Sequence, residues 1–167
     1  IKAVFAVFTV VDRAEWMDAS IFDEFDRAVP WTRVVVPGRT RFENEEGDLH
    51  ALLRARRREF VLKPNDDYGG KGITLGGEVD AATWDAALEA ATDNDYVVQQ
   101  RVEMIAESFP SFADGLKPQD LFVDLDPFLY LGRVGGVLAR LGVGSLCNVT
   151  SGGGQVPVMV VPDEDEA

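Results

Sequence analysis

The stretch from Phe60 to Gly77, FVLKPNDDYGGKGITLGG, constrains the fold of this chain more than any other. A short apolar run (60–62) and a second extended run (73–75) flank a polar segment that contains Gly-Gly-Lys-Gly at positions 69–72. Extended runs separated by Gly, Asn and Asp are typical of strands joined by a turn. The pattern therefore predicts a strand, a glycine loop and a second strand.

The predicted loop has the composition of a phosphate-binding segment. Glycines lack Cβ, so their backbone N–H groups can approach an anion closely. Lys63 and Lys71 add positive charge on either side of the turn, and the chain has only two other lysines, Lys2 and Lys117. We interpret the loop as a nucleotide-phosphate cradle between two strands. A glycine-rich hairpin with solvated lysines is the alternative that the loop alone leaves open.

Two common phosphate loops do not fit this stretch. A Walker A loop requires Gly-Lys-Ser/Thr at the start of a helix, whereas Lys71 is followed by Gly72 and a β-type run. A dinucleotide-binding fingerprint would require a glycine at position 75, which is Leu75. A phosphate cradle here would be of a different kind.

Five segments in one order carry a resemblance to a known family. They are PWTR (30–33), VLKPNDDYGGKGI (61–73), VVQQRVE (97–103), DLDPFLYLG (124–132) and NVTSGGGQVPV (148–158). Together they resemble the circularly permuted ATP-grasp proteins, the group related to glutathionylspermidine synthase. The resemblance implies an α+β fold with mixed or antiparallel sheets, flanking helices and a nucleotide cleft between two lobes.

The resemblance also implies nucleotide-binding residues. The residues implied at the phosphates are Lys63, Tyr68, Gly69, Gly70, Lys71 and Gly72. Those implied at the adenine hinge are Gln100, Arg101 and Val102, with Glu103 at the ribose hydroxyls. Asn148 would contact phosphate or metal, although an Asn/Gly turn explains it equally well.

A predicted strand at 121–131 carries two acidic residues on one face. Alternation places Asp124 and Asp126 on the same side, between aromatic residues. Two neighbouring carboxylates are unfavourable without a cation, and Mg²⁺ bound to nucleotide phosphates is one such partner. A solvated edge strand with exposed acids is the alternative. The resemblance points to Asp124, with Asp126 beside it, as the metal ligands.

Arg140 lies among apolar residues on the predicted partner strand, 136–143. An arginine in such surroundings needs an anion. It could pair with Asp124 as a structural ion pair, or contact a transferred phosphoryl group. The resemblance favours the second role and makes Arg140 the catalytic residue.

The activity that the resemblance implies is ATP-dependent ligation of a carboxylate to an amine through an acyl-phosphate. ATP and Mg²⁺ are then required, and the substrates are small-molecule or peptide acids and amines. The metal-binding Glu-x-Asn that completes such sites does not occur in the chain. We therefore expect the chain to be part of a longer protein, inactive without the rest of its polypeptide. The alternatives are a nucleotide-binding or interaction module without ligase activity, and a structural β-domain that binds no nucleotide.

Composition limits the possible partners and compartment. The net charge of −13 argues against nucleic acid and anionic membranes as partners. A single cysteine, Cys147, excludes an internal disulfide. With no long apolar run and no signal peptide, we expect a cytoplasmic protein.

The remaining segments complete the expected organisation. Helices are expected over 12–28, 47–58 and from Asp80 to about 91; strands over 32–36, 96–103 and 156–161; loops over 39–44 and 104–118; and either a strand or a helix over 1–11. We expect a small lobe over 1–120 with its phosphate loop at 66–72, part of a second sheet lobe over 121–161, and an acidic tail over 162–167. The three tryptophans and Cys147 are expected to be buried, and His50 to have a packing or surface role.

Overall fold

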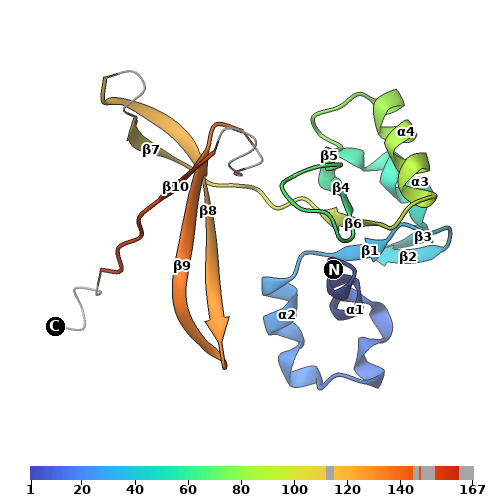
Figure 1. Cartoon of the computed structure of the whole chain (residues 1–167). Coiled ribbons are helices and arrows are strands. Elements are labelled where there is room, and N and C mark those ends of the chain that lie inside the picture. Colours follow the sequence, from blue (N-terminus) through green and yellow to red (C-terminus); the bar gives the residue numbers. More distant parts are fainter. Residues whose placement is uncertain (112–114, 145–146, 148–152, 162–167) are drawn as a thin grey trace. The chain divides into compact units, whose positions relative to one another are not determined.

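The computed structural model describes residues 1–111, 115–144, 147 and 153–161 (Figure 1). The chain divides into two compact units, Ile1–Val102 and Glu103–Ala167. Both contain antiparallel sheets, and the helices among the described residues lie in the first unit, so the fold class is α+β as expected. The expected boundary at residue 120 therefore lies inside the second unit, whose first strand begins at Ala106.

The first unit is built on a four-stranded antiparallel sheet. Its strands, in spatial order, are β1 (Thr32–Val34), β6 (Tyr96–Gln100), β4 (Phe60–Pro64) and β5 (Thr74–Leu75). The pairing of β4 with β5 confirms the strand, loop and strand predicted for the stretch 60–77. β6 ends at Gln100, before the expected end at Glu103. The amides of Gln100 and Arg101 still donate to the carbonyl oxygens of Trp31 and Glu59, in line with the registers of β1 and β4.

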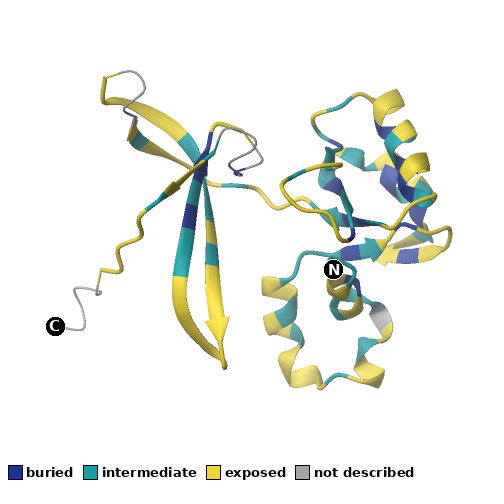
Figure 2. Cartoon of the chain, in the orientation of Figure 1, coloured by how far each residue is buried: buried dark blue, intermediate teal, exposed yellow. Residues whose placement is uncertain are grey.

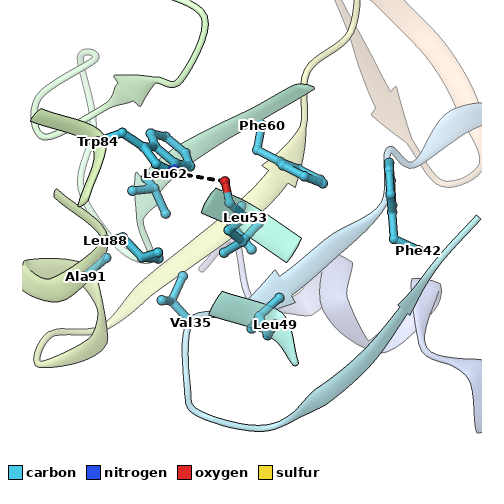
Figure 3. Close-up of a cluster of buried hydrophobic side chains, with 10 residues drawn as sticks. Val35, Phe42, Leu49, Leu53, Phe60, Leu62, Trp84, Leu88 and Ala91 are labelled. Carbon is cyan, nitrogen blue, oxygen red and sulfur yellow. Dashed lines mark hydrogen bonds between the residues drawn. The ribbon is translucent and has the colours of Figure 1, made fainter. Parts of the chain in front are cut away.

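The core of the first unit lies between this sheet and two helices, α3 (Leu49–Ala55) and α4 (Ala81–Thr92) (Figure 3). Trp84 is completely buried, and its indole N–H donates to the carbonyl oxygen of Leu53 at 3.0 Å. Asp80 accepts a hydrogen bond from the amide of Thr83 at 2.8 Å, which confirms the predicted N-cap of α4. The exposed faces of both helices point away from this core (Figure 2).

The segment 39–48 corrects one expectation. It is a hairpin of β2 (Arg39–Phe42) and β3 (Glu45–Asp48), where a polar loop and the start of a helix were expected. Thr40 and Phe42 alternate onto the buried face, and Phe42 is only 1% exposed. The helix that follows begins after Asp48, which caps it by accepting from the amide of Ala51 at 2.9 Å. It ends at Ala55, and a 3-10 helix spans Arg57–Glu59.

The N-terminal region also differs from expectation. Residues 1–11 contain a helix, α1 (Val4–Thr9), and the single helix expected over 12–28 is broken into 3-10 helices at Val11–Glu15 and Ala19–Ile21 followed by α2 (Phe22–Ala28). The Asp18 side chain accepts from the amide of Ser20 at 2.8 Å, a local bond that competes with helix continuation. Trp16, at the break, is 51% exposed, so its expected burial is wrong. Trp31 packs at the edge of the core.

The second unit is a four-stranded antiparallel sheet. Its strands, in spatial order, are β10 (Gly154–Val156), β9 (Arg133–Gly142), β8 (Lys117–Tyr130) and β7 (Ala106–Ser111). The predicted pairing of the two long strands is confirmed, with a tighter turn than expected at Leu131-Gly132, where φ is 47° and 76°.

The loop expected over 104–118 is wrong, because β7 occupies part of it. Pro110 lies opposite Pro118 in this pair. β7 is the terminal strand of the sheet, and β8 pairs with β9 only from Phe122 onward. Each proline therefore has a neighbouring strand on one side only, and its missing N–H removes no hydrogen bond to a second strand. The last strand ends at Val156, whereas residues 156–161 were expected to be extended in a strand. The tail at 162–167 lies outside the described residues. None of the described helices has the length and apolar character needed to cross a bilayer.

Candidate functional site

The loop between β4 and β5 has a backbone that requires its glycines. Gly69, Gly70 and Gly72 have φ values of 69°, 77° and 66°, a region that side chains with a Cβ disfavour. Gly72 is also tightly packed, since a Cβ at this position would lie 2.7 Å from Pro64 Cγ and 2.8 Å from the hydroxyl of Tyr96. The glycines therefore shape the loop and close its base.

Lys63 extends from β4 near the start of this loop and is partly buried. Its ammonium donates to Oε1 of Gln99 at 2.6 Å. No carboxylate among the described residues forms an ion pair with it. Burial, with the positive charge of Lys2 as the second cause, lowers the pKa of Lys63 below its ordinary value. This is a cation whose protein partner is a neutral amide.

The first residues of the loop are fixed to two distant segments. The buried side chain of Asn65 accepts from the amide of Ala3 at 2.8 Å and donates to Oδ2 of Asp95 at 2.8 Å. The Lys2 ammonium donates to the carbonyl oxygens of Pro64 and Asp67, each at 2.7 Å. These two residues hold the beginning of the loop in place. The sequence alone did not identify them, because an asparagine after Lys-Pro reads as an ordinary turn residue.

The tip of the loop is open to solvent. Tyr68 is 79% exposed, and the Lys71 ammonium lies 5.8 Å from the centroid of its ring, within reach of a weak cation–π contact. Tyr68 also donates its amide to Oδ1 of Asp67 at 2.8 Å. Two aspartates, Asp66 and Asp67, oppose the lysines in this region. The positive charge available to an anion here comes from Lys63 and Lys71, with the Lys2 ammonium close by at the start of the loop.

The segment expected to contact adenine is partly engaged in the sheet. The amide of Gln100 donates to the carbonyl oxygen of Trp31, and that of Arg101 to Glu59, each at 2.7 Å. The Arg101 guanidinium lies 3.6 Å from a carboxylate oxygen of Glu78. Val102 is 61% exposed and ends the first unit, and Glu103 begins the second. Adenine could not bind the two engaged amides without breaking these bonds.

The second unit contains an ion cluster at the centre of β8 and β9. Asp124 and Arg140 are directly paired in register, and Nη2 of Arg140 lies 2.5 Å from Oδ2 of Asp124 and 2.7 Å from Oδ2 of Asp126. The two carboxylates therefore share one face, as the alternation predicted. Of the two roles that the sequence left open for Arg140, the structure shows the ion pair with Asp124. Its Nε is buried and has no hydrogen-bond partner among the described residues.

Asp124 and Asp126 are the carboxylates that could bind Mg²⁺ at this cluster. Mg²⁺ commonly takes one or two carboxylates together with phosphate oxygens and water, which Asp124 and Asp126 can provide. The described part of the chain contains no group of three or more His, Cys, Asp or Glu side chains that could hold a metal alone. The ion would therefore need phosphate oxygens as well, and it would compete with Arg140. Asn148 lies outside the described residues.

Two residues that invite over-interpretation have structural roles, as expected. Cys147 is buried next to Gly142, and its thiol lies 3.5 Å from the carbonyl oxygen of Phe122. Burial raises the pKa of the Cys147 thiol, the Asp124 carboxylate raises it further, and Arg140 lowers it. Nε2 of His50 is 2.8 Å from the hydroxyl of Thr92, a packing contact between α3 and α4.

The candidate residues thus form two groups. Lys63 and the glycine loop lie together in the first unit, and Asp124, Asp126 and Arg140 lie together in the second. Comparison with protein-family models, curated proteins and solved structures gives no match for this chain. A function must therefore be argued from these residues and the motifs that contain them.

Proposed function

We propose that this chain is the ATP-binding part of an ATP-dependent carboxylate–amine ligase of the ATP-grasp type. The observation that carries the proposal is the Lys63 ammonium, which is partly buried beside a glycine loop and contacts an amide oxygen at 2.6 Å. A buried cation is costly unless an anion approaches it. A nucleotide phosphate would supply that anion, and the order of the five sequence motifs supports the same ligand.

In this proposal the protein mainly places charge. In the first unit, Lys63, Lys71 and the amides of residues 69–72 would contact the phosphates. In the second unit, Asp124 and Asp126 are the carboxylates that could hold Mg²⁺. When bound, Mg²⁺ supplies positive charge that neutralises the phosphates. Arg140, which pairs with Asp124 and Asp126, is the cation that would contact the transferred phosphoryl group, where a fixed cation stabilises developing charge. The substrate carboxylate attacks the γ-phosphate and ADP leaves; an amine then displaces phosphate to give an amide.

One observation favours a second candidate, a nucleotide-binding module without ligase activity. Arg140 already satisfies both Asp124 and Asp126, at 2.5 and 2.7 Å, as a structural cluster would. Such a module would bind nucleotide through Lys63 and the loop without using the acidic pair for metal. Mg²⁺-independent binding of ATP would separate this candidate from the ligase.

Isothermal titration of the full chain with Mg-ATP tests the proposal. We expect binding by the wild type, binding about tenfold weaker by Lys63→Ala because one charge-assisted contact is lost, and no change for Lys117→Ala, an exposed lysine of β8. A ligand at 100 times its dissociation constant also stabilises the fold by about 2.7 kcal/mol, which a thermal shift detects. Equal binding by wild type and Lys63→Ala would contradict the proposal.

A further inference from the structure

A chain of hydrogen bonds runs from Lys63 across the sheet of the first unit. The Lys63 ammonium donates to Oε1 of Gln99 at 2.6 Å, and Nε2 of Gln99 donates to the hydroxyl of Thr32 at 3.0 Å. The Thr32 hydroxyl in turn lies 2.8 Å from the carbonyl oxygen of Pro30. Gln99 lies opposite Thr32 on one side and Val61 on the other, so the chain crosses β4, β6 and β1.

The chemistry at the two ends of this series of hydrogen bonds fixes which group donates and which accepts in each bond. An ammonium can only donate, so Gln99 must turn its oxygen toward Lys63. The Pro30 carbonyl can only accept, so the Thr32 hydroxyl must donate to it and accept from the Gln99 amide. Thr32 is completely buried, so bulk solvent does not compete for its hydroxyl. The Gln99 carbonyl is therefore held toward the ammonium.

An amide at position 99 differs from a carboxylate in a way that matters for ligand binding. Glutamate has nearly the same shape, but it would form a partly buried ion pair and neutralise Lys63. Glutamine supplies only a dipole, which fixes the ammonium and leaves its net charge intact. Lys2 also acts on Lys63, but it is a cation that donates to the carbonyl oxygens of Pro64 and Asp67. It therefore does not neutralise the charge of Lys63.

We propose that Gln99, oriented by Thr32, is a positioning residue that fixes the Lys63 ammonium and keeps its charge available for a phosphate group. This inference rests on the proposed function for the identity of the ligand, a nucleoside triphosphate. It adds a prediction that the function alone does not make: a negative charge at position 99 raises the pKa of Lys63 and weakens binding of the phosphate group.

The test compares Gln99→Glu with wild type in the full chain by three measurements. NMR of the lysine side chains gives the pKa of Lys63, thermal unfolding gives stability, and titration gives the affinity for Mg-ATP. We expect Gln99→Glu to raise the pKa of Lys63 and to weaken Mg-ATP binding by about tenfold or more. Thermal unfolding measures the cost of losing the Gln99 donor to the Thr32 hydroxyl. Gln119→Glu, which adds the same charge at an exposed position of β8, should change none of the three.

Thr32 provides a second series that does not depend on how Gln99→Glu folds. Thr32→Ser keeps the hydroxyl and should bind Mg-ATP like the wild type, whereas Thr32→Val should bind a few-fold more weakly because the Gln99 amide is no longer oriented. Gln99→Met removes the oxygen that accepts from Lys63 and adds no charge at position 99. It should weaken Mg-ATP binding without raising the pKa of Lys63.

The possible outcomes separate this inference from the proposed function. If Gln99→Glu raises the pKa of Lys63 and still binds Mg-ATP like the wild type, the inference is overturned and the proposed function stands. An unchanged pKa of Lys63 in Gln99→Glu overturns the inference as well. If the wild type binds no Mg-ATP, the proposed function fails; inorganic triphosphate then replaces it as the probe, and loss of its binding in Gln99→Glu supports the inference, whereas retained or absent binding overturns it.

Discussion

The backbone of Gly72 lies against the ring of Pro64, so that a Cβ at position 72 would come within 2.7 Å of Pro64 Cγ. Pro64 ends β4, and Gly72 lies at the other end of the loop, two residues before β5. The loop is thus closed at its base by packing, and Gly72 combines that contact with a φ of 66°. Lys63, the residue before Pro64, is presented from this closed base.

The close contact makes Gly72 sensitive to the smallest substitution. We expect Gly72→Ala to lower the free energy of unfolding by about 1–3 kcal/mol, because it adds both a strained φ and a clash with a rigid ring. Urea unfolding measures the change. Gly38→Ala is the matched control, since a Cβ at position 38 meets nothing within 4 Å. Equal losses for the two variants would show that the base of the loop is not packed as described.

Asn65 should be the most sensitive polar residue of the loop. Asn65→Ala removes two hydrogen bonds and leaves the amide of Ala3 and the carboxylate of Asp95 without this partner. We expect a loss of about 1–3 kcal/mol in the free energy of unfolding, measured in urea. Asn94→Ala removes one hydrogen bond at an exposed position and should cost less. The reverse order would contradict the anchoring role of Asn65.

Removal of Arg140 should expose the repulsion between Asp124 and Asp126. Because these side chains are about a third exposed, we expect Arg140→Met to lower the free energy of unfolding by only about 1–2 kcal/mol. Mg²⁺ should recover part of this loss, since it can then bind the freed carboxylates. Arg133→Met, an exposed arginine at the start of β9, is the control for the charge change. Thermal unfolding with and without Mg²⁺ decides: an equal Mg²⁺ effect on all three proteins would exclude the acidic pair as a metal site.

Cys147 should give the fold a specific dependence on pH. The thiol has a raised pKa in the folded protein, so both states keep the proton below its ordinary value of 9.0. Above that pH the unfolded chain releases the proton first, and the free energy of unfolding falls. The stability of the wild type relative to Cys147→Ala should therefore be constant below pH 9 and decrease above it. A relative stability that rises with pH would contradict the burial of this thiol.

The features that the sequence predicted correctly depend on local chemistry. Asp80 caps the residues that follow it directly, and the shared face of Asp124 and Asp126 follows from strand alternation. The features that were missed depend on distant partners. Thr40 and Phe42 lie in a strand that pairs with β3 and packs against the core. β7 pairs with β8, including the part of β8 that lies beyond β9. The bonds from Lys63 to Gln99 and from Asn65 to Ala3 likewise join residues that no local pattern connects.

The chain has four lysines, at positions 2, 63, 71 and 117, so chemical labelling can locate the phosphates directly. An acyl-phosphate derivative of ATP transfers its acyl group to lysines that lie beside the bound phosphates, and peptide mass spectrometry identifies the modified residue. The account predicts labelling of Lys63 or Lys71 that excess Mg-ATP suppresses, with Lys117 unaffected by competition. Equal labelling of all four lysines, or labelling that Mg-ATP does not suppress, would contradict it.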